Sequence, residues 1–221
     1  MGSIIALAGV AIFAVFAISV LSKIFGNFSP RRGKVQNDLK KIKTELQPWL
    51  TDLVPFEEKD IELLSLNQIK NTSKKGIVKT AKGIFTSIYH EPMVAYGYKK
   101  YVASGTNALL YAKTTDHEFI YRINNDEVEI VIDDHLAGIM KKDGKFYGAK
   151  SNKLLAQVNQ GSEDLLLPVI VKGKEIGSIV NPAKASKTNP RALEYVGNLD
   201  KDEETLFLSF AVLEMVQRNF K

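Results

Sequence analysis

An uncharged apolar segment near the N-terminus is the strongest constraint in this sequence. From residue 3 to residue 22 the chain reads SIIALAGVAIFAVFAISVLS, without a single charged side chain. Twenty helical residues are about 30 Å long, which matches the hydrocarbon core of a bilayer. We therefore predict a transmembrane anchor over residues 1–22. A cleaved signal peptide is the alternative, but no Lys or Arg precedes the apolar run, and the run is longer than a usual signal-peptide core.

The residues after this segment predict its orientation. Between residues 23 and 50, seven basic side chains stand against two acidic ones, and this excess equals the whole net charge of +5. Cationic flanks stay on the cytoplasmic side, so we expect the N-terminus outside and the C-terminal domain in the cytoplasm. The same basic side chains are candidates for contact with anionic lipid, the alternative being that they only fix the topology. They are Lys23, Arg31, Arg32, Lys34, Lys40, Lys41 and Lys43.

Small residues recur within the predicted anchor at every third position. Such a strip favours close packing against another membrane helix, although alanine is common in anchors. The strip consists of Ala8, Ala11, Ala14 and Ala17.

The basic linker, residues 23–58, contains a second helical pattern. Apolar side chains at positions 35, 39, 42 and 46 predict an amphipathic helix from Lys34 to Leu46, which we expect Pro48 to end. This helix suits either the surface of the bilayer or a face of its own domain, and the pattern leaves both open. Trp49 and Phe56 follow it, and they are expected either at the lipid interface or packed on the domain.

From about residue 61 the hydrophobic period changes from 3.6 to 2, which predicts short strands. Turn residues at 124–126, 143–144 and 173 separate apolar runs in the manner of hairpins. Since no long helical pattern interrupts these runs, we expect an antiparallel sheet. The expected strands are 62–68, 76–80, 83–90, 93–102, 107–114, 118–123, 128–133, 135–141, 145–149, 154–159, 165–172, 175–181 and 193–199.

The last segment predicts a helix of a different kind. Asp200 is a suitable N-cap, and three acidic residues at 202–204 suit the positive end of a helix dipole. From Leu206 to Val216 the segment is apolar on nearly every face, so it must be enclosed, and it is too short to span a bilayer. We therefore predict that residues 59–221 form a mainly β domain: an antiparallel closed barrel of about 12 strands around a buried C-terminal helix.

This order of elements resembles the tubby C-terminal-like superfamily, which includes the LURP-one-related proteins and the phospholipid scramblases. The resemblance is architectural and covers about residues 61–221. It is carried by the strand run from KGIFTSI (82–88) to LEYVG (193–197) and by the closing helix, Thr205–Val216. It implies a tubby-like barrel, and a role in phosphoinositide binding, phospholipid movement or membrane-proximal regulation.

Motifs of the common enzyme classes are absent from the sequence. It contains no G-x-S-x-G, no phosphate-binding G-x-x-x-x-G-K-[ST], no G-x-G-x-x-G and no H-E-x-x-H. It also contains no cysteine, which excludes disulfides, thiol catalysis and thiolate metal sites. We therefore assign no catalytic residue and no cofactor.

Two patterns resemble metal sites. His90, His117 and His135 each neighbour a carboxylate and would suit a metal if they converged, but solvated strand ends are favoured because no paired-ligand motif is present. The acidic segment from Asp200 lacks the glycine and the glutamate of a calcium loop, so helix capping is preferred and no metal ligand is assigned.

Basic side chains also recur within the expected sheet. Lysine pairs occur at 74–75, 99–100 and 141–142, and Lys184, Lys187 and Arg191 lie in a polar loop. If they converged they would bind phosphate groups, whereas separate pairs would only protect strand edges from aggregation. The sequence outside residues 1–50 has no basic excess, which argues against nucleic acid as a partner.

Three functions follow, in order of preference. The first is a single-pass, membrane-anchored, non-catalytic accessory or scaffold subunit that docks a cytoplasmic barrel on a larger membrane-protein complex. The second is a module that binds anionic phospholipid, and the third is an enzyme acting on lipid or envelope material. The expected partners are the bilayer, a membrane protein and an anionic phospholipid.

Overall fold

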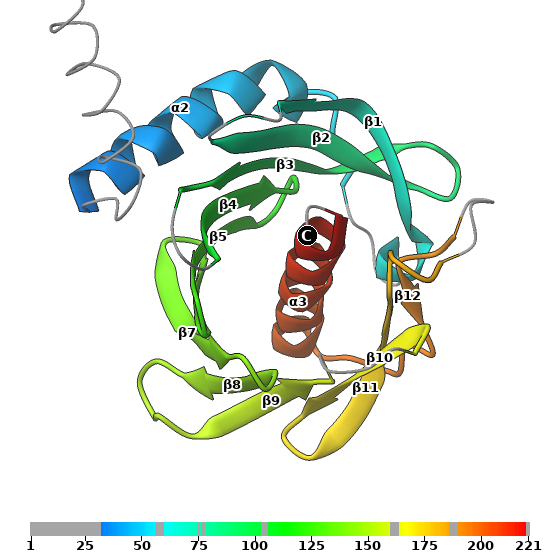
Figure 1. The fold of residues 1–221 in the computed structure, drawn as a ribbon. Coiled ribbons are helices and arrows are strands. Elements are labelled where there is room, and N and C mark those ends of the chain that lie inside the picture. The colour runs from blue at the N-terminus through cyan, green and yellow to red at the C-terminus, as the bar shows by residue number, and fades with distance from the viewer. Residues whose placement is uncertain are drawn as a thin grey trace, which may run out of the picture.

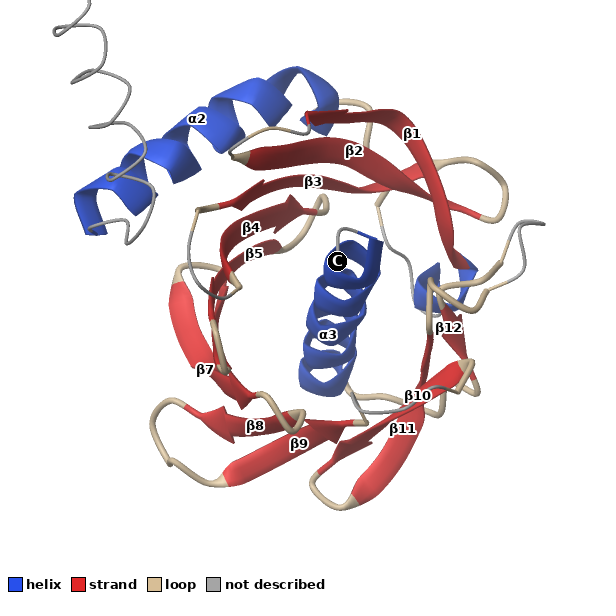
Figure 2. Ribbon diagram, viewed as in Figure 1, coloured by secondary structure: helices blue, strands red, loops and turns tan. Residues whose placement is uncertain are grey.

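In the computed structural model, the described residues are 32–55, 60–74, 76, 78–102, 106–159, 164–185 and 190–219. They form a sheet that curves around one helix, with a second helix outside (Figures 1 and 2). The elements are α2 (Arg32–Leu50), η1 (Asp60–Leu63), β1 (Leu64–Lys74), β2 (Lys79–Ser87), β3 (Pro92–Lys100), β4 (Asn107–Lys113), β5 (Glu118–Asn124), β6 (Glu127–Ile132), β7 (His135–Lys141), β8 (Lys145–Gly148), β9 (Leu154–Val158), β10 (Leu166–Val171), β11 (Lys174–Val180), β12 (Leu193–Glu194) and α3 (Lys201–Asn219).

Within the described residues the sheet has twelve antiparallel strands, and each pairs with its neighbours in sequence. The first and last strands meet at a short seam. There the Leu66 N–H donates to the Pro190 carbonyl at 3.0 Å, and the Ala192 N–H donates to the Leu64 carbonyl at 2.7 Å. Strand β12 has only two residues, so few hydrogen bonds join it to β1 and the barrel is not fully closed. The predicted mainly β, antiparallel barrel with a C-terminal helix is confirmed, but the barrel is nearly closed rather than closed.

Helix α3 runs through the middle of the barrel (Figure 1). It begins with a capping box, in which Asp200 Oδ1 accepts the Glu203 N–H at 2.8 Å and the Asp200 N–H donates to Glu203 Oε2 at 3.3 Å. Residues 207–216 are all buried, and eight of these ten are apolar; the two polar ones are Ser209 and Glu214. The Phe210 ring meets the Phe146 ring edge-on at 5.3 Å. The helix therefore fills the part of the barrel where a ligand cavity would otherwise lie.

Several element boundaries differ from the prediction. Strand β1 was expected at 62–68 but runs from Leu64 to Lys74. The segments 76–80 and 83–90 were expected as separate strands, but residues 79–87 form the single strand β2, because the alternation continues through the polar Thr80 and Lys82. The last strand was expected to reach residue 199 but ends at Glu194. The next residue, Tyr195, takes a left-handed φ of 55°. Helix α2 passes Pro48, which has no N–H to donate to the Thr44 carbonyl, and ends two residues later at Leu50.

No helix among the described residues is long and apolar enough to cross a bilayer. The predicted membrane segment, with Ala8, Ala11, Ala14 and Ala17, lies outside the described residues.

Candidate functional site

Helix α2 packs on the outer surface of the barrel, over β3 and β4 (Figure 1). Leu46 is fully buried, and Ile42 lies directly against the backbone of Gly97. Further along, Trp49 and Leu50 pack against a small buried cluster formed by Leu53, Ile84 and Ala95. Of the two placements that the sequence leaves open, packing on its own domain is therefore the one observed.

Charged contacts also join α2 and the turn after it to the strands. One carboxylate oxygen of Asp38 accepts a hydrogen bond from Lys99 Nζ at 2.5 Å, and the other accepts one from the Tyr101 hydroxyl at 2.9 Å. Three further ion pairs follow along the helix and the turn, and they join Lys43 to Glu118, Glu45 to Lys82 at 3.2 Å, and Asp52 to Lys70 at 2.7 Å.

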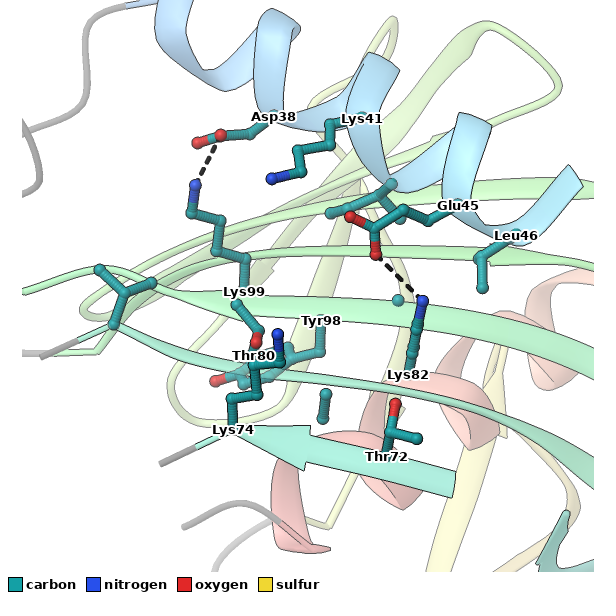
Figure 3. A pocket seen from close by; sticks show the side chains of 14 residues that line it. Asp38, Lys41, Glu45, Leu46, Thr72, Lys74, Thr80, Lys82, Tyr98 and Lys99 are labelled. Carbon is teal, nitrogen blue, oxygen red and sulfur yellow. Dashed lines mark hydrogen bonds and ion pairs between the residues drawn. The ribbon is translucent and has the colours of Figure 1, made fainter. Parts of the chain in front are cut away.

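A groove of about 560 Å³ lies between α2 and strands β1 to β3 (Figure 3). The strand register explains which side chains line it. Lys74 of β1 pairs with Thr80 of β2, which pairs with Lys99 of β3, so the two lysines flank the threonine on one face. Adjacent strands lie about 4.8 Å apart, which puts the backbones of Lys74 and Lys99 roughly 10 Å from each other. The groove is thus bordered by cations from separate strands.

The groove carries an excess of positive charge. Lysines 41, 74, 82 and 99 line it together with two carboxylates, Asp38 and Glu45, each of which is bound to one lysine. Lys41 and Lys74 have no carboxylate partner among the described residues. Figure 3 shows Lys41 extending from α2 between the two ion pairs. An anion in this groove would meet two lysines that need not leave an existing partner.

Two tyrosines of the strand segment beside the groove keep their protons at physiological pH, and Tyr98 is also part of the barrel core. Burial raises the pKa of the Tyr98 phenol to about 12. Burial also raises the pKa of Tyr101, and the neighbouring Asp38 carboxylate raises it further. Tyr101 therefore keeps its proton and donates it to Asp38.

The structure separates the basic side chains predicted to contact lipid. Lys41 lines the groove, whereas Lys43 is held by Glu118 and lies over the Tyr111 ring. Arg32 and Lys40 are exposed on α2, and Lys34 is partly buried. Lys23 and Arg31 lie outside the described residues, as does Phe56. Trp49 packs on the barrel beneath Lys70 and Lys82, whose amino groups lie 5.8 and 5.3 Å from its ring centroid.

The lysine pairs converge only in part. Lys74 and Lys99 meet at the groove, but Lys141 and Lys142 lie elsewhere and form ion pairs with Glu127 and Asp126. Arg191 donates to the Glu62 carbonyl at the barrel seam. Lys82 was not among the residues predicted from the sequence, although its position two residues after Thr80 on the outward face of a strand indicates that it lies beside that residue.

Two of the three histidines meet at one residue. His117 Nδ1 lies 2.7 Å from Asp133 Oδ2, and His135 Nδ1 lies 2.7 Å from the Asp133 carbonyl oxygen, while His90 occupies a separate turn. Burial alone would raise the pKa of Asp133, but the Glu118 N–H and the His117 ring lower it. No cluster of three metal ligands occurs within the described part of the chain.

The other nitrogen of His117 lies 3.2 Å from Thr205 Oγ1, which gives the Thr–His–Asp order of a hydrolase triad. The Thr205 hydroxyl, however, donates to the Lys201 carbonyl at 2.8 Å, within its own helix. A hydroxyl engaged in this way is a helix contact rather than an activated nucleophile. We therefore place the candidate site at the lysine-lined groove.

Comparisons of the chain with protein-family models, with curated proteins and with solved structures gave no match.

Proposed function

We propose that this chain is a membrane-anchored, non-catalytic module that binds the headgroup of an anionic phospholipid in the groove between α2 and the barrel. The observation that carries the proposal is the convergence of four lysines on one groove beside only two carboxylates. Lysine ammonium groups and threonine hydroxyls suit phosphate oxygens, and the groove has the size of a small-molecule site.

The predicted anchor would keep this groove near a bilayer. Nine residues separate the apolar segment from the first residue of α2, and a chain of that length reaches at most about 30 Å. The single-pass anchor and the cytoplasmic placement of the barrel remain part of the proposal. Burial of α3 inside the barrel supports the non-catalytic assignment, because it leaves the interior filled.

The test measures lipid retained by the full chain in an uncharged detergent, with native mass spectrometry as the readout. We expect phosphatidylglycerol to be retained in preference to phosphatidylcholine, with a steep loss as salt rises. The double substitution Lys41→Gln and Lys74→Gln should lower retention about tenfold, because it removes the two lysines without a carboxylate partner. Equal retention by this variant and the unchanged chain would overturn the proposal.

A matched variant controls for net charge. Lys150→Gln and Lys153→Gln remove the same charge from exposed positions in the turn between β8 and β9 and should leave retention unchanged. Inorganic pyrophosphate added in place of lipid distinguishes a lipid headgroup from free phosphate. Tight binding of pyrophosphate with no retention of lipid would assign the groove to a soluble anion instead.

The larger membrane complex expected from the sequence, and membership of the tubby-like superfamily, stay predictions.

A further inference from the structure

We infer that an anion bound in the groove controls whether the N-terminal half of α2 stays docked on the barrel, a regulation that rests on the proposed headgroup binding. The inference comes from the different ways in which the two halves of this helix are held.

The C-terminal half of α2 is held by apolar burial. Leu46 is inaccessible to solvent, and Trp49 and Leu50 pack against the Leu53, Ile84 and Ala95 cluster. A bound anion has no direct means of weakening these contacts, because they depend on area removed from water rather than on charge.

The N-terminal half, residues 32–40, has no fully buried side chain. Asp38 of this half makes polar contacts with the barrel, where it binds Lys99 and Tyr101. In Figure 3 this ion pair lies at the end of the groove, beside Lys41. Val35 and Leu39 are only partly buried, so the docking of this half depends in part on a carboxylate whose cation also lines the proposed anion site.

An anion in the groove would weaken that contact in two ways. Its phosphate oxygens would compete with Asp38 for Lys99, which is paired in register with Thr80 and so with Lys74. Its negative charge would also repel the Asp38 carboxylate directly, at short range and in a partly buried place. Both effects favour a state in which Lys99 and Lys41 bind the anion and Asp38 leaves the barrel, so that the released stretch is residues 32–40 and Lys41 stays at the groove.

Release of this half has a measurable consequence. Most helical stability in proteins comes from tertiary packing, so nine residues that no longer pack on the barrel should fray from the N-terminal end of α2. Its backbone amides would then exchange with solvent faster, while those of the C-terminal half stay protected.

The experiment is hydrogen–deuterium exchange on the full chain in nanodiscs of phosphatidylcholine, with and without phosphatidylglycerol. We expect exchange of residues 33–40 to rise several-fold in the anionic nanodiscs, with little change in residues 46–50. Asp38→Asn should show the faster exchange without anionic lipid and no further rise with it. Asp52→Asn, which removes the Lys70 ion pair beyond the C-terminal end of the helix, should leave residues 33–40 unchanged.

Lipid retention, measured separately as above, keeps the two proposals distinct. Retention of phosphatidylglycerol without faster exchange of residues 33–40 would overturn the inference and leave the proposed function standing. Absence of retention by the groove would overturn both. Equal effects of Asp38→Asn and Asp52→Asn on the exchange of residues 33–40 would also contradict the inference. The faster exchange would then come from a general loosening of α2 rather than from loss of the Asp38 contact.

Discussion

Ile42 of α2 occupies the space that a side chain at Gly97 of β3 would need. A Cβ atom built on Gly97 would overlap Ile42 Cγ2 and would also stand 3.6 Å from Leu46 Cδ1. The close approach of helix and strand thus depends on the missing side chain at one strand position.

Gly97→Ala should therefore lift α2 from the barrel. We expect a loss of about 1–3 kcal/mol in the free energy of unfolding, the usual cost of overpacking. Denaturant unfolding of the full chain in detergent, followed by fluorescence, measures it. The sequence has one tryptophan, Trp49, which belongs to α2 and packs against the barrel, so its emission also reports docking.

Gly33→Ala on the same helix is the control. A Cβ there meets no atom within 4 Å, so the change should be neutral or stabilise by up to about 1 kcal/mol through helix propensity. An unchanged unfolding midpoint and unchanged Trp49 emission in Gly97→Ala would contradict the packing described.

Phe210→Ala tests whether α3 is the core of the barrel. Phe210 is fully buried against Phe146, so its truncation should cost about 3–5 kcal/mol in the free energy of unfolding. Leu154→Ala, at a position that is half exposed, should cost about 0.5 kcal/mol or less. Similar costs at both positions, measured by equilibrium unfolding, would contradict a packed interior.

The ion pair between Glu214 and Arg218 is buried within α3, with Arg218 Nε 2.6 Å from Glu214 Oε2. Arg218→Met leaves the Glu214 carboxylate in place without this cation, and we expect a loss of about 3 kcal/mol in stability. Adding Glu214→Leu should recover most of that loss, because no carboxylate then remains to be buried. A double-mutant cycle measured by denaturant unfolding checks this, and additive costs would argue against strong coupling.

Asp133 should give stability a specific dependence on pH. Its pKa in the folded protein is lowered by the Glu118 N–H and the His117 ring, despite the opposing effect of burial. A carboxyl with a depressed folded pKa stabilises the fold above its unfolded pKa of about 4 and loses that contribution as pH falls through the folded value. Asp133→Asn should therefore cost about 0.5–1 kcal/mol at neutral pH, a modest amount for a half-exposed group.

The measurement is the unfolding free energy of both proteins between neutral pH and pH 2. The difference should be constant above about pH 5 and shrink below about pH 4. A difference that grows on acidification would have the wrong sign for this assignment.

The barrel was predictable because its signals are local. Alternation of apolar and polar residues, hairpin turns and a wholly apolar last segment each act over a few residues, and Asp200 caps α3 as its position predicts. The site was less predictable because it depends on register. Nothing along the chain indicates that Lys74 and Lys99 flank Thr80, since a shift of one residue would turn either side chain to the opposite face.

The surface on which α2 packs was also not predictable from the sequence. Its spacing predicts an amphipathic helix, but spacing alone does not distinguish a lipid surface from a protein surface. The close packing of α2 on the barrel depends on Gly97, which lies 55 residues after Ile42 in the sequence. The two residues come together only when the strands are assembled.

The position of α3 also bears on how the molecule comes to be made. Every strand precedes this helix in the chain, so during synthesis the complete sheet leaves the ribosome before its own core exists. Until α3 arrives, the inner faces of the strands have no partner, and such exposed surfaces associate with other chains. Closure of the seam between β1 and β12 then becomes a late step, and a chain halted before residue 201 is an open apolar sheet that depends on a chaperone.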